Sequence, residues 1–463
     1  MIVMKFGGTS VGSAKEIKRV VELVSNEKGD RVVVVSAMSG VTNSLLAAAN
    51  KVIELPSGVV EKEVNKFHKE MLDKHVSTAE EVIADKKVLG EVREEIEKLA
   101  EELKVALLGV GYLEELSPKS LDYVVSFGER FSILLVSGAL NAAGIKAKAL
   151  TGHEAGIVTD SNFGRARPLH STMENSVRER VGPVVAEGIV AVVAGFIAAD
   201  KDANTTTMGR GGSDYTASLL GRCLSAKEVQ IWTDVDGILS TDPKIVPEAK
   251  LIKTLSYVEA MDLAYFGAKV IHSKMIAPAM DADIPVRIKN TFNPGSEGTL
   301  IVREQEKIET VIKAVAVHRN VDIVNLKGIG MAETPNIAGK VFTLLGDENI
   351  NIIMISGSSE SNLSFVLERK DVPKAVERLN ERFLGNGVRN IDLMEGVCII
   401  TIVGVGMHGA KGIAARVFQA VSDEDVNIIM IAQGSSEVNI SFIVEEKDGD
   451  RVVKALHKKF IEG

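Results

Sequence analysis

The chain has 463 residues, of which 45% are hydrophobic and 25% are charged, and its net charge is −9. At roughly 100–200 residues per domain, this length predicts about two to four domains of ordinary globular composition. The negative charge and the lack of a dense lysine/arginine block argue against a nucleic-acid surface. The longest near-apolar run, 188–199, is shorter than the ~20 residues that span a bilayer.

Two further features bear on the cellular compartment. Cys223 and Cys398 lie far apart and match no disulfide or metal-binding spacing, which suits a reducing environment. The N-terminal residues MIVMKFGG contain no apolar signal core. We therefore expect a cytoplasmic protein that has neither a membrane nor a nucleic acid as its partner.

The first predicted element is a short strand, followed by a glycine loop and an amphipathic helix. The stretch VMKFGGTSVG puts Lys5 before Gly7 and Gly8, whereas the P-loop, G-x-x-x-x-G-K-[ST], carries its lysine after the glycines. Thr9 and Ser10 come next, so the loop offers backbone and hydroxyl donors to a phosphate. An ordinary strand-to-helix turn with a solvent-exposed Lys5 fits the same residues equally well.

A second strand, loop and helix follow in RVVVVSAMSGVTNSLL. Ser36 and Thr42 lie at the strand end, and capping of the next helix would be a sufficient role for their hydroxyls. A continuous apolar strand of this kind indicates a sheet that is covered on both faces. Residues 60–115 are rich in Glu and Lys at helical spacing and predict a solvated helical excursion from that sheet. Glu129 and Arg130 follow a helical stretch, a setting typical of a surface ion pair.

A second glycine loop lies in TTTMGRGGSDYTASLL and leads into another helix. Its Arg210 and Ser213 precede a helix N-terminus, where anions are favoured, and Asp214 could orient Lys5. Strand–loop–helix units also appear in GIVAVVAGFIAA and in EVQIWTDVDGILSTDP, whose strand ends at Asp234. The chain has no H-E-x-x-H, no Cys/His cluster and no G-x-S-x-G, which weakens metallohydrolase and serine-hydrolase hypotheses.

A polar stretch over 293–311 predicts a domain boundary, and an internal repeat lies beyond it. Residues 328–371 match 404–448, and each copy has the pattern of strand, glycine turn, helix, strand, tight loop, strand and helix. Two copies are too few for a solenoid and indicate a paired α/β module. GVGMHG at 404–409 has the form of a dinucleotide-binding loop, but no acidic residue closes the next strand. A fused dehydrogenase is therefore not expected.

Five ordered motifs, KFGGTSV, SFGER, GRGGSDYTA, WTDVDGI and YFGAKVIH, resemble those of the aspartate kinases within the amino acid kinase family. The tail is similar to a tandem pair of ACT domains, which are small amino-acid-sensing modules, so the resemblance covers essentially the whole chain. It implies an α/β amino acid kinase fold, with a mainly parallel sheet between helical layers, followed by two ferredoxin-like α+β ACT domains. The first ACT module would be inserted into the second, and a strand near 312–318 would complete the C-terminal module.

The same resemblance implies the domain boundaries and the regulation. The catalytic domain would cover 1–303, a linker and a strand for the ACT pair 304–324, the first ACT domain 325–395 and the second 396–463. ACT modules of the family pair between subunits, so a homodimer or a dimer of dimers is implied. An amino-acid effector, lysine or threonine, would bind near that interface.

The implied reaction transfers the γ-phosphoryl group of ATP to the side-chain carboxylate of L-aspartate, giving 4-phospho-L-aspartate and ADP. This is the first step of lysine, threonine and methionine biosynthesis. A carboxylate with a pKa of about 4 is ionised at neutral pH, so no general base is needed. The protein must instead neutralise charge as an anion attacks a polyanion, and Lys5 at a strand end can do so. Mg²⁺ would bind mainly through the ATP phosphates and water, with no protein ligand assigned.

The resemblance also assigns residues to the sites. The implied catalytic residues are Lys5 and Asp214. The implied ATP-binding residues are Lys5, Gly7, Gly8, Thr9, Ser10, Thr233, Asp234, Leu239, Lys244 and Lys269. The implied substrate residues are Arg210 for the α-carboxylate, Glu129 for the ammonium group, and Ser36, Thr42, Ser213 and the backbone at Phe196. Polar residues recur at the strand ends of both tail copies, where they could bind the charged backbone groups of an amino acid or simply hydrogen-bond to polar groups at the sheet edge. The effector candidates are Asn351, Ser358, Asn427, Gln433 and Ser435.

Several residues depart from the family pattern. Leu239 stands where a tyrosine often lies beside the nucleotide, and Lys244 stands where arginine is common, which suggests altered ATP affinity. Ser273 replaces the usual proline after a histidine. The first ACT copy lacks the glycine before its helix and has no counterpart of Gln433, so the two effector sites are expected to differ.

Two other functions stay open on the residues alone. Another amino acid kinase, such as one that phosphorylates glutamate, would keep the phosphate loops but lack the combination of SFGER with GRGGSDY. A non-catalytic amino-acid sensor would explain the ACT pair but would leave Lys5 and Arg210 without a purpose.

Overall fold

The structure is a computed structural model that describes residues 1–267, 271–303, 311–328, 336–359, 362–434 and 436–462. Its backbone contacts divide the chain into two compact units. Unit 1 consists of Met1–Ile238, Lys253–Tyr257 and Val270–Glu304, and unit 2 of Leu239–Ile252, Val258–Lys269 and Gln305–Gly463. Two segments of the expected catalytic region, 239–252 and 258–269, thus pack with the C-terminal part of the chain, which the boundary at 303 does not anticipate.

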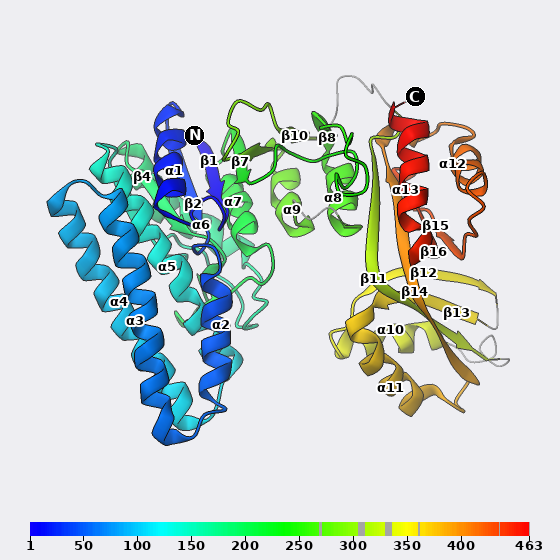
Figure 1. Ribbon diagram of the computed structural model, residues 1–463, viewed down its shortest axis with the longest axis horizontal. Helices are drawn as coiled ribbons and strands as arrows, with labels where there is room; N and C mark the ends of the chain where they lie inside the picture. The colour runs from blue at the N-terminus through cyan, green and yellow to red at the C-terminus, as the bar shows by residue number, and fades with distance from the viewer. Residues whose placement is uncertain (268–270, 304–310, 329–335, 360–361, 435, 463) are drawn as a thin grey trace. The chain divides into compact units, whose positions relative to one another are not determined.

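Unit 1 is built on an eight-stranded sheet with the strand order β3-β4-β2-β1-β7-β9-β10-β8 (Figure 1). The strands are β1 (Ile2–Phe6), β2 (Arg31–Val35), β3 (Ala147–Leu150), β4 (Val190–Ala194), β7 (Glu228–Thr233), β8 (Thr254–Ser256), β9 (Val286–Asn290) and β10 (Thr299–Val302). Every neighbouring pair is parallel except β9 and β10, which are antiparallel. The expectation of a mainly parallel sheet is therefore confirmed.

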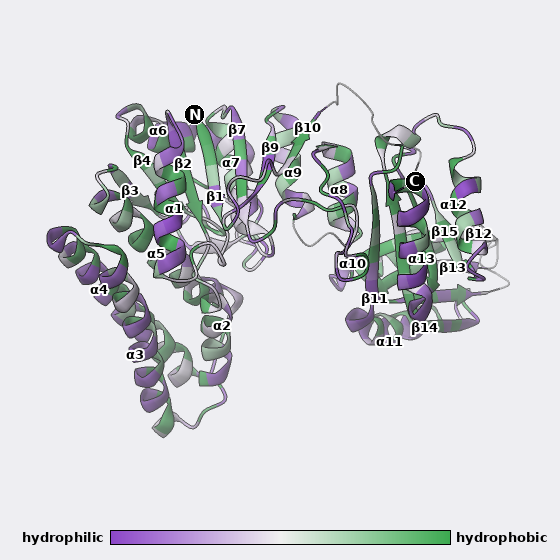
Figure 2. Cartoon of the chain, turned by 45° about the horizontal axis from the view of Figure 1, so that its top comes forward, coloured by the Kyte–Doolittle hydropathy of each residue, from purple (hydrophilic) through white to green (hydrophobic). Residues whose placement is uncertain are grey.

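Helices cover both faces of this sheet. They are α1 (Ala14–Asn26), α2 (Val41–Val52), α3 (Ser57–Val82), α4 (Lys86–Leu113), α5 (Pro118–Ala142), α6 (His170–Ala186), α7 (Gly212–Cys223) and α9 (Ser273–Asp281). α1 packs on α5 in one layer, and α7 packs on α6 and α9 in the other. Figure 2 shows the hydrophobic colour along β1 and β2 between these layers. Since both faces are covered, β1 and β2 are buried along nearly their whole length.

The region 60–115 is helical, as predicted, and forms the antiparallel pair α3 and α4. Asp85 begins α4 as an N-cap, because its carboxylate accepts from the N–H groups of Lys87 and Val88. The outer faces carry ion pairs such as Arg93–Glu97, whereas the inner faces belong to the main core cluster of unit 1. The excursion is therefore part of the core and not only a solvated appendage.

α5 is long and apolar enough to cross a membrane by length and composition alone. However, 83% of its most apolar window is buried inside the protein. The helix contacts α1, α2, α3 and α4 as well as β4, so its apolar surface is covered by its own unit.

His75 in α3 is a buried titratable group that makes the stability of unit 1 depend on pH. Its side chain is fully buried, its Nδ1 lies 2.7 Å from the Met71 carbonyl oxygen, and its ring stacks on Phe131. Burial lowers the pKa of His75 to about 4. The unfolded chain has the ordinary histidine pKa of about 6.5, so below pH 6.5 protons bind the unfolded chain more tightly than the folded one. The free energy of unfolding is therefore greatest above pH 6.5 and falls as the pH drops toward 4, by up to about 3 kcal/mol.

His75→Phe keeps the ring that stacks on Phe131 but cannot be protonated. We expect this variant to lose less stability than the wild type between pH 7 and pH 4.5, as measured by urea unfolding at both values. Equal losses in the two proteins would show that His75 does not titrate as its burial requires.

The apolar run 188–199 forms two strands of different sheets. β4 ends at Ala194, and β5 (Ile197–Ala199) pairs with β6 (Thr205–Thr207) in a separate antiparallel hairpin. Between them Phe196 has φ of +66°, a left-handed conformation that is uncommon for a residue with a side chain. The change of direction at Phe196 therefore divides the run between two strands, where the sequence was interpreted as part of a strand–loop–helix unit.

Unit 2 contains a six-stranded antiparallel sheet with the order β12-β13-β11-β14-β16-β15. The strands are β11 (Ala314–Lys327), β12 (Ile352–Ser359), β13 (Asn362–Glu368), β14 (Asn390–Val403), β15 (Met430–Ala432) and β16 (Asn439–Glu445). β11 pairs with β13 through 321–327 and with the C-terminal half of β14 through 314–318. One long strand therefore serves both copies of the repeat, as expected from the inserted arrangement.

The helices of the two copies pack on separate cores. α10 (Ile337–Asp347) and α11 (Val372–Phe383) cover the first copy, and α12 (Ile413–Ser422) and α13 (Gly449–His457) cover the second. Gly404, which opens the dinucleotide-like motif, has a packing role, because a Cβ at this position would lie 2.2 Å from the Val311 carbonyl oxygen. The expected α/β repeat is confirmed.

Side-chain contacts hold the segments 239–252 and 258–269 against the rest of unit 2. From 239–252, the Ser240 hydroxyl lies 2.8 Å from Nε2 of His457. α8 (Tyr257–Tyr265) supplies Glu259, which pairs with the buried Lys313 at 3.2 Å, and Asp262, which accepts from Asn439 at 2.7 Å. These contacts lie inside unit 2 and explain why the segments belong to it.

Candidate functional site

The carboxyl ends of four adjacent parallel strands bring together most of the expected site residues of unit 1. In the order β4, β2, β1 and β7, these ends lead into Phe196, Ser36, the glycine loop after Lys5, and Thr233. Ligands of parallel α/β sheets bind in this position, outside the carboxyl ends of the strands. The predicted residues are distant in sequence, but the strand order makes them neighbours.

Lys5 and Asp214 form an ion pair at the centre of this edge. Lys5 Nζ lies 2.5 Å from Asp214 Oδ1, and their side chains are only 10% and 16% exposed. Asp214 stands in the first turn of α7, where the helix dipole favours a negative charge. The alternative of a solvent-exposed Lys5 is therefore wrong, and the expected contact with Asp214 is present.

The first glycine loop has two backbone donors that remain available. Ser10 is buried, its N–H donates to the Gly7 carbonyl and its hydroxyl lies 2.7 Å from that of Thr291, so its polar groups are engaged. Within the described part of the chain, the N–H groups of Gly8 and Thr9 have no hydrogen-bond partner. Thr291 was missed by the sequence analysis, and its position directly after β9 was the one signal for it.

Glu129 is buried, which contradicts the expected surface ion pair with Arg130. Its Oε1 accepts from the Ala37 N–H at 3.1 Å, and its Oε2 has no hydrogen-bond partner among the described residues. Burial raises the pKa of Glu129 to about 8, against the opposing effects of the Ala37 N–H and the charge of Lys5. Arg130 instead pairs with Glu102 at 2.8 Å. An orphaned buried carboxyl oxygen is typical of a site that receives a ligand.

The second glycine loop presents Arg210 to solvent. Arg210 is exposed, and its guanidinium makes no ion pair or hydrogen bond with the residues that the structure describes. Ser213 is buried against Gly195, since a Cβ on that glycine would lie 2.6 Å from the Ser213 Cβ. The Phe196 N–H donates to the Thr216 hydroxyl, and its carbonyl accepts from the Met208 N–H. Both backbone groups of Phe196 are thus already used within the protein.

The remaining substrate candidates and the nucleotide candidates are placed as follows. Ser36 and Thr42 are half-buried, after β2 and at the start of α2. Thr233 ends β7 and donates to the exposed Asp234 at 3.1 Å. Leu239 and Lys244 belong to unit 2, and Lys269 lies outside the described residues.

The effector candidates lie in unit 2. Asn351 and Asn427 are exposed in the loops that precede β12 and β15, and Gln433 is exposed directly after β15. For Ser358 the structure describes only the backbone, as part of β12, and Ser435 lies outside the described residues. A missed neighbour is Tyr265 of α8, whose hydroxyl lies 3.1 Å from the carbonyl oxygens at both 352 and 353.

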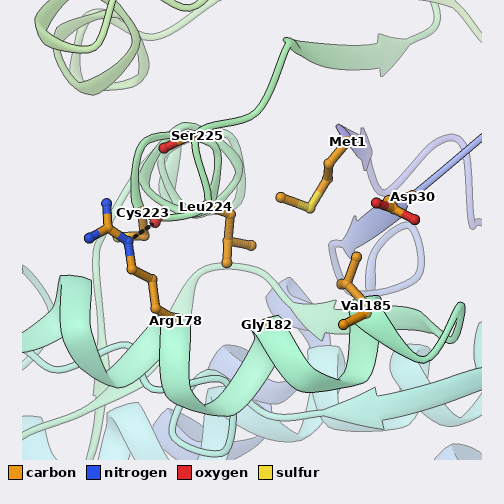
Figure 3. Close-up of a pocket in the computed structure, with 9 residues that line it drawn as sticks. Met1, Asp30, Arg178, Gly182, Val185, Cys223, Leu224 and Ser225 are labelled. Atoms are coloured by element: carbon orange, nitrogen blue, oxygen red, sulfur yellow. Dashed lines mark hydrogen bonds between the residues drawn. The ribbon is translucent and has the colours of Figure 1, made fainter.

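A cavity of about 410 Å³ opens at the other end of the sheet, where the parallel strands begin (Figure 3). Met1 and Asp30, which precede β1 and β2, line it together with Arg178, whose Nε donates to the Cys223 carbonyl. Because the expected residues lie at the carboxyl ends, this cavity is not the candidate site. No three His, Cys, Asp or Glu side chains among the described residues form a metal-binding group.

Comparison with known proteins agrees with this arrangement. A model of the amino acid kinase family matches residues 1–290, and an ACT domain model matches 324–383 and 400–460. The chain is 37% identical over 471 residues to aspartokinase 2, chloroplastic, of Arabidopsis thaliana, covering 99% of this chain and 84% of that protein. It is 33% identical over 470 residues to the aspartokinase of Pseudomonas aeruginosa, covering 99% and 97%.

Solved structures of similar proteins include E. coli aspartokinase III. Its complex with aspartate and ADP, in the R-state, superposes with a TM-score of 0.85 at 32% identity and covers 99% of each chain. Its complex with lysine and aspartate, in the T-state, gives a TM-score of 0.80 at 32% identity and covers 100% of this chain and 99% of that one. The chain therefore belongs to the amino acid kinase family, as an aspartokinase with C-terminal ACT domains.

Proposed function

We propose that the aspartokinase reaction of this chain takes place at the carboxyl ends of β1, β2, β4 and β7, with Lys5 as the group that neutralises the transferring phosphoryl. The observation that carries this proposal is the 2.5 Å pair between Lys5 and Asp214. Asp214 holds the ammonium group against the first glycine loop, where a Cβ on Gly7 would lie 3.5 Å from Lys5 Nζ, and the same loop carries the free N–H groups of Gly8 and Thr9. Together they present positive charge and donors to the equatorial oxygens of a phosphoryl group in transfer.

ATP would approach from the side of β7. Thr233 and Asp234 lie next to the loop of Lys5, since β7 pairs with β1. By resemblance, Leu239, Lys244 and Lys269 are further candidates for nucleotide contacts. Mg²⁺ would enter as the counterion of the ATP phosphates, since it prefers oxygen ligands and retains water. The ion would supply further neutralisation of the phosphates, while the protein side chains orient the two reactants.

L-Aspartate would lie between α5 and the second glycine loop. The exposed guanidinium of Arg210 is suited to a bidentate contact with the α-carboxylate. The orphaned oxygen of Glu129 would receive the ammonium group. Ser36, Thr42 and Ser213 would add hydroxyl contacts, and Phe196 could offer only the second lone pair of its carbonyl oxygen, because its backbone is already bonded.

A coupled ADP-release assay with aspartate and with glutamate tests this function. If the α-groups are held as proposed, the extra methylene of glutamate moves its side-chain carboxylate by more than 1 Å, and a misplacement of that size costs about 10²-fold in rate. We expect turnover with aspartate and little with glutamate. Turnover with glutamate alone would favour a different amino acid kinase, and turnover with neither would favour a sensor.

Regulation through the ACT pair is part of the same proposal. The E. coli relative was solved with lysine in a T-state, and here Asn351 and Asn427 stand exposed at equivalent places of the two copies, with Gln433 exposed after β15 of the second copy alone. Lysine or threonine could inhibit only by preferring a less active arrangement. A coupling of about 1–3 kcal/mol would change the affinity for aspartate by about 5–150-fold.

Titration of lysine and threonine, singly and together, into the full-length enzyme should therefore raise the KM for aspartate. Gln433→Ala is expected to weaken this response and to leave the activity without effector unchanged. Gln419→Ala, which is exposed on α12 of the same copy, is the matched control and should respond like the wild type. Binding of neither amino acid to the intact protein would leave the ACT pair as a dimerisation module. Full-length variants are preferable to truncation at 303, which would strip 239–252 and 258–269 of their partners in unit 2.

We also propose a homodimer or a dimer of dimers that forms through the ACT modules, and a cytoplasmic location. Light scattering of the purified chain with and without lysine gives the mass directly. A monomer at micromolar concentration would contradict the proposed assembly.

A further inference from the structure

Asp122, near the start of α5, is a buried carboxylate to which the proposed reaction gives no role. Its side chain is 2% exposed, and three donors surround it. Oδ2 accepts from the Gly164 N–H and from the Thr207 N–H, both at 2.8 Å, and Oδ1 accepts from the Thr207 hydroxyl at 2.7 Å. A buried carboxylate needs such donors to offset its lost hydration.

One partner of Asp122, Thr207, belongs to the segment that leads to Arg210, and the other, Gly164, lies against that segment. Thr207 is the last residue of β6, three positions before Arg210. Gly209 lies between them with φ of +71°, and a Cβ there would lie 3.1 Å from the Gly164 carbonyl oxygen. The loop is therefore fixed at Thr207 by Asp122, and it passes directly against a second segment that Asp122 also holds.

The side chain of Arg210 is exposed and makes no ion pair or hydrogen bond with the described residues, so the direction in which it leaves the loop depends on the backbone around it. On the C-terminal side the Gly212 N–H bonds to the Gly209 carbonyl, and on the N-terminal side the backbone is held at Thr207. Asp122 and Glu129 lie seven residues apart on α5, which places them two turns apart on one face of the helix. One helix face thus reaches both the loop of Arg210 and the pocket of Glu129.

We propose that Asp122 is a positioning residue for substrate binding: it fixes the loop of Thr207 and Gly209 so that Arg210 meets the α-carboxylate of aspartate. This inference rests on the proposed role of Arg210. Two residues of α5 would then have different roles: Glu129 contacts the substrate directly, whereas Asp122 acts through the loop that carries Arg210.

The test compares three variants of the full-length enzyme by steady-state kinetics. Asp122→Ala removes all three acceptor contacts and is expected to raise the KM for aspartate about 10-fold, with the KM for ATP within about twofold of the wild type. Asp122→Asn should restore the wild-type KM, because its amide oxygen can accept from both N–H groups while its NH₂ donates to the Thr207 hydroxyl. An equal rise of both KM values, or no rescue by asparagine, would overturn the positioning role.

Asp200→Ala is the matched control for a purely structural effect. Asp200 is 5% exposed and accepts from Ser161, Asp202 and Asn204, so it is as buried and as well bonded as Asp122. It stands at the opposite end of the β5–β6 hairpin from Arg210. This variant is expected to lower the melting temperature but to leave the KM for aspartate unchanged, and a similar rise in KM would contradict the inference.

A double-mutant cycle separates this inference from the proposed function. If Asp122 acts through Arg210, then Asp122→Ala should add little to the KM of Arg210→Ala, whereas independent effects would multiply. If Arg210→Ala alone leaves the KM for aspartate unchanged, the proposed function has failed. If Arg210→Ala raises it and Asp122→Ala does not, only the positioning role has failed.

Discussion

Replacement of Lys5 by alanine is expected to lower kcat by about 10²–10³, the largest effect of any single substitution at this site. Lys5 Nζ is the cation paired with Asp214 at the carboxyl end of β1, where the phosphoryl group would be transferred. Its charge is needed most in the transition state, so kcat should fall much more than the KM for aspartate rises. Single-turnover measurement of ADP formation would assign the loss to the chemical step.

The design must separate this loss from a loss of folding. Lys5→Ala leaves the carboxylate of Asp214 without its partner in a largely buried place, which costs stability. The double variant Lys5→Ala/Asp214→Asn removes both charges and should be more stable, yet equally impaired in kcat. Lys148→Ala is a matched control, an exposed lysine on β3 of the same sheet, and should be unaffected. A near-normal kcat in Lys5→Ala would refute its assigned role.

The second large effect is expected for the aspartate pocket. Arg210→Ala should raise the KM for aspartate about 10- to 150-fold, which corresponds to the loss of about 1.5–3 kcal/mol of charge-assisted hydrogen bonding. Since Arg210 is exposed and unpaired, the variant should fold normally. Glu129→Gln should also raise the KM for aspartate and keep the acceptor for the Ala37 N–H. An equal rise in the KM for ATP would point to a structural role for either residue.

Glu129 should make the KM for aspartate depend on pH, and the direction of the change can be stated. Because burial raises the pKa of Glu129 to about 8, the carboxyl group of the free enzyme is protonated below that pH. Pairing with the substrate ammonium group requires the ionised form, so aspartate binding should release a proton. The KM for aspartate should therefore fall by up to about tenfold per unit as the pH rises toward 8 and should level off above it. In Glu129→Gln this slope should vanish; a KM independent of pH in the wild type would contradict the pairing.

Local patterns in the sequence were sufficient to predict the first strand and helix and the internal repeat of the tail. The order of apolar strand, glycine loop and helix around Lys5 predicts β1 and α1, because periodicity and turn chemistry act over a few residues. The two copies in the tail predict the paired module, because each copy carries the same buried positions. The same local reasoning was correct only for the first strand of 188–199: after Phe196, which has a left-handed conformation, the chain forms β5 of a second sheet and not the helix of a strand–loop–helix unit.

The resemblance to aspartate kinases supplied the residues of the site, but not their environment. The residue types alone made Glu129 and Arg130 a surface pair. Whether a charged side chain is buried depends on what packs over its helix, and α5 lies inside the core of unit 1. The buried position of Glu129, with its raised pKa, is therefore a result of packing that no local pattern contains.

The sequence by itself determined β1, β2, β4 and β7, the two glycine loops and the duplicated tail, since each depends on neighbours along the chain. Only the tertiary structure decided which distant residues meet: Lys5 with Asp214, Ser10 with Thr291, and Asp122 with Gly164 and Thr207. It also decided that 239–252 and 258–269 belong with the C-terminal unit. The physical reason is that strand order and packing between layers bring together residues far apart in the chain, and no pattern within a few residues specifies that order.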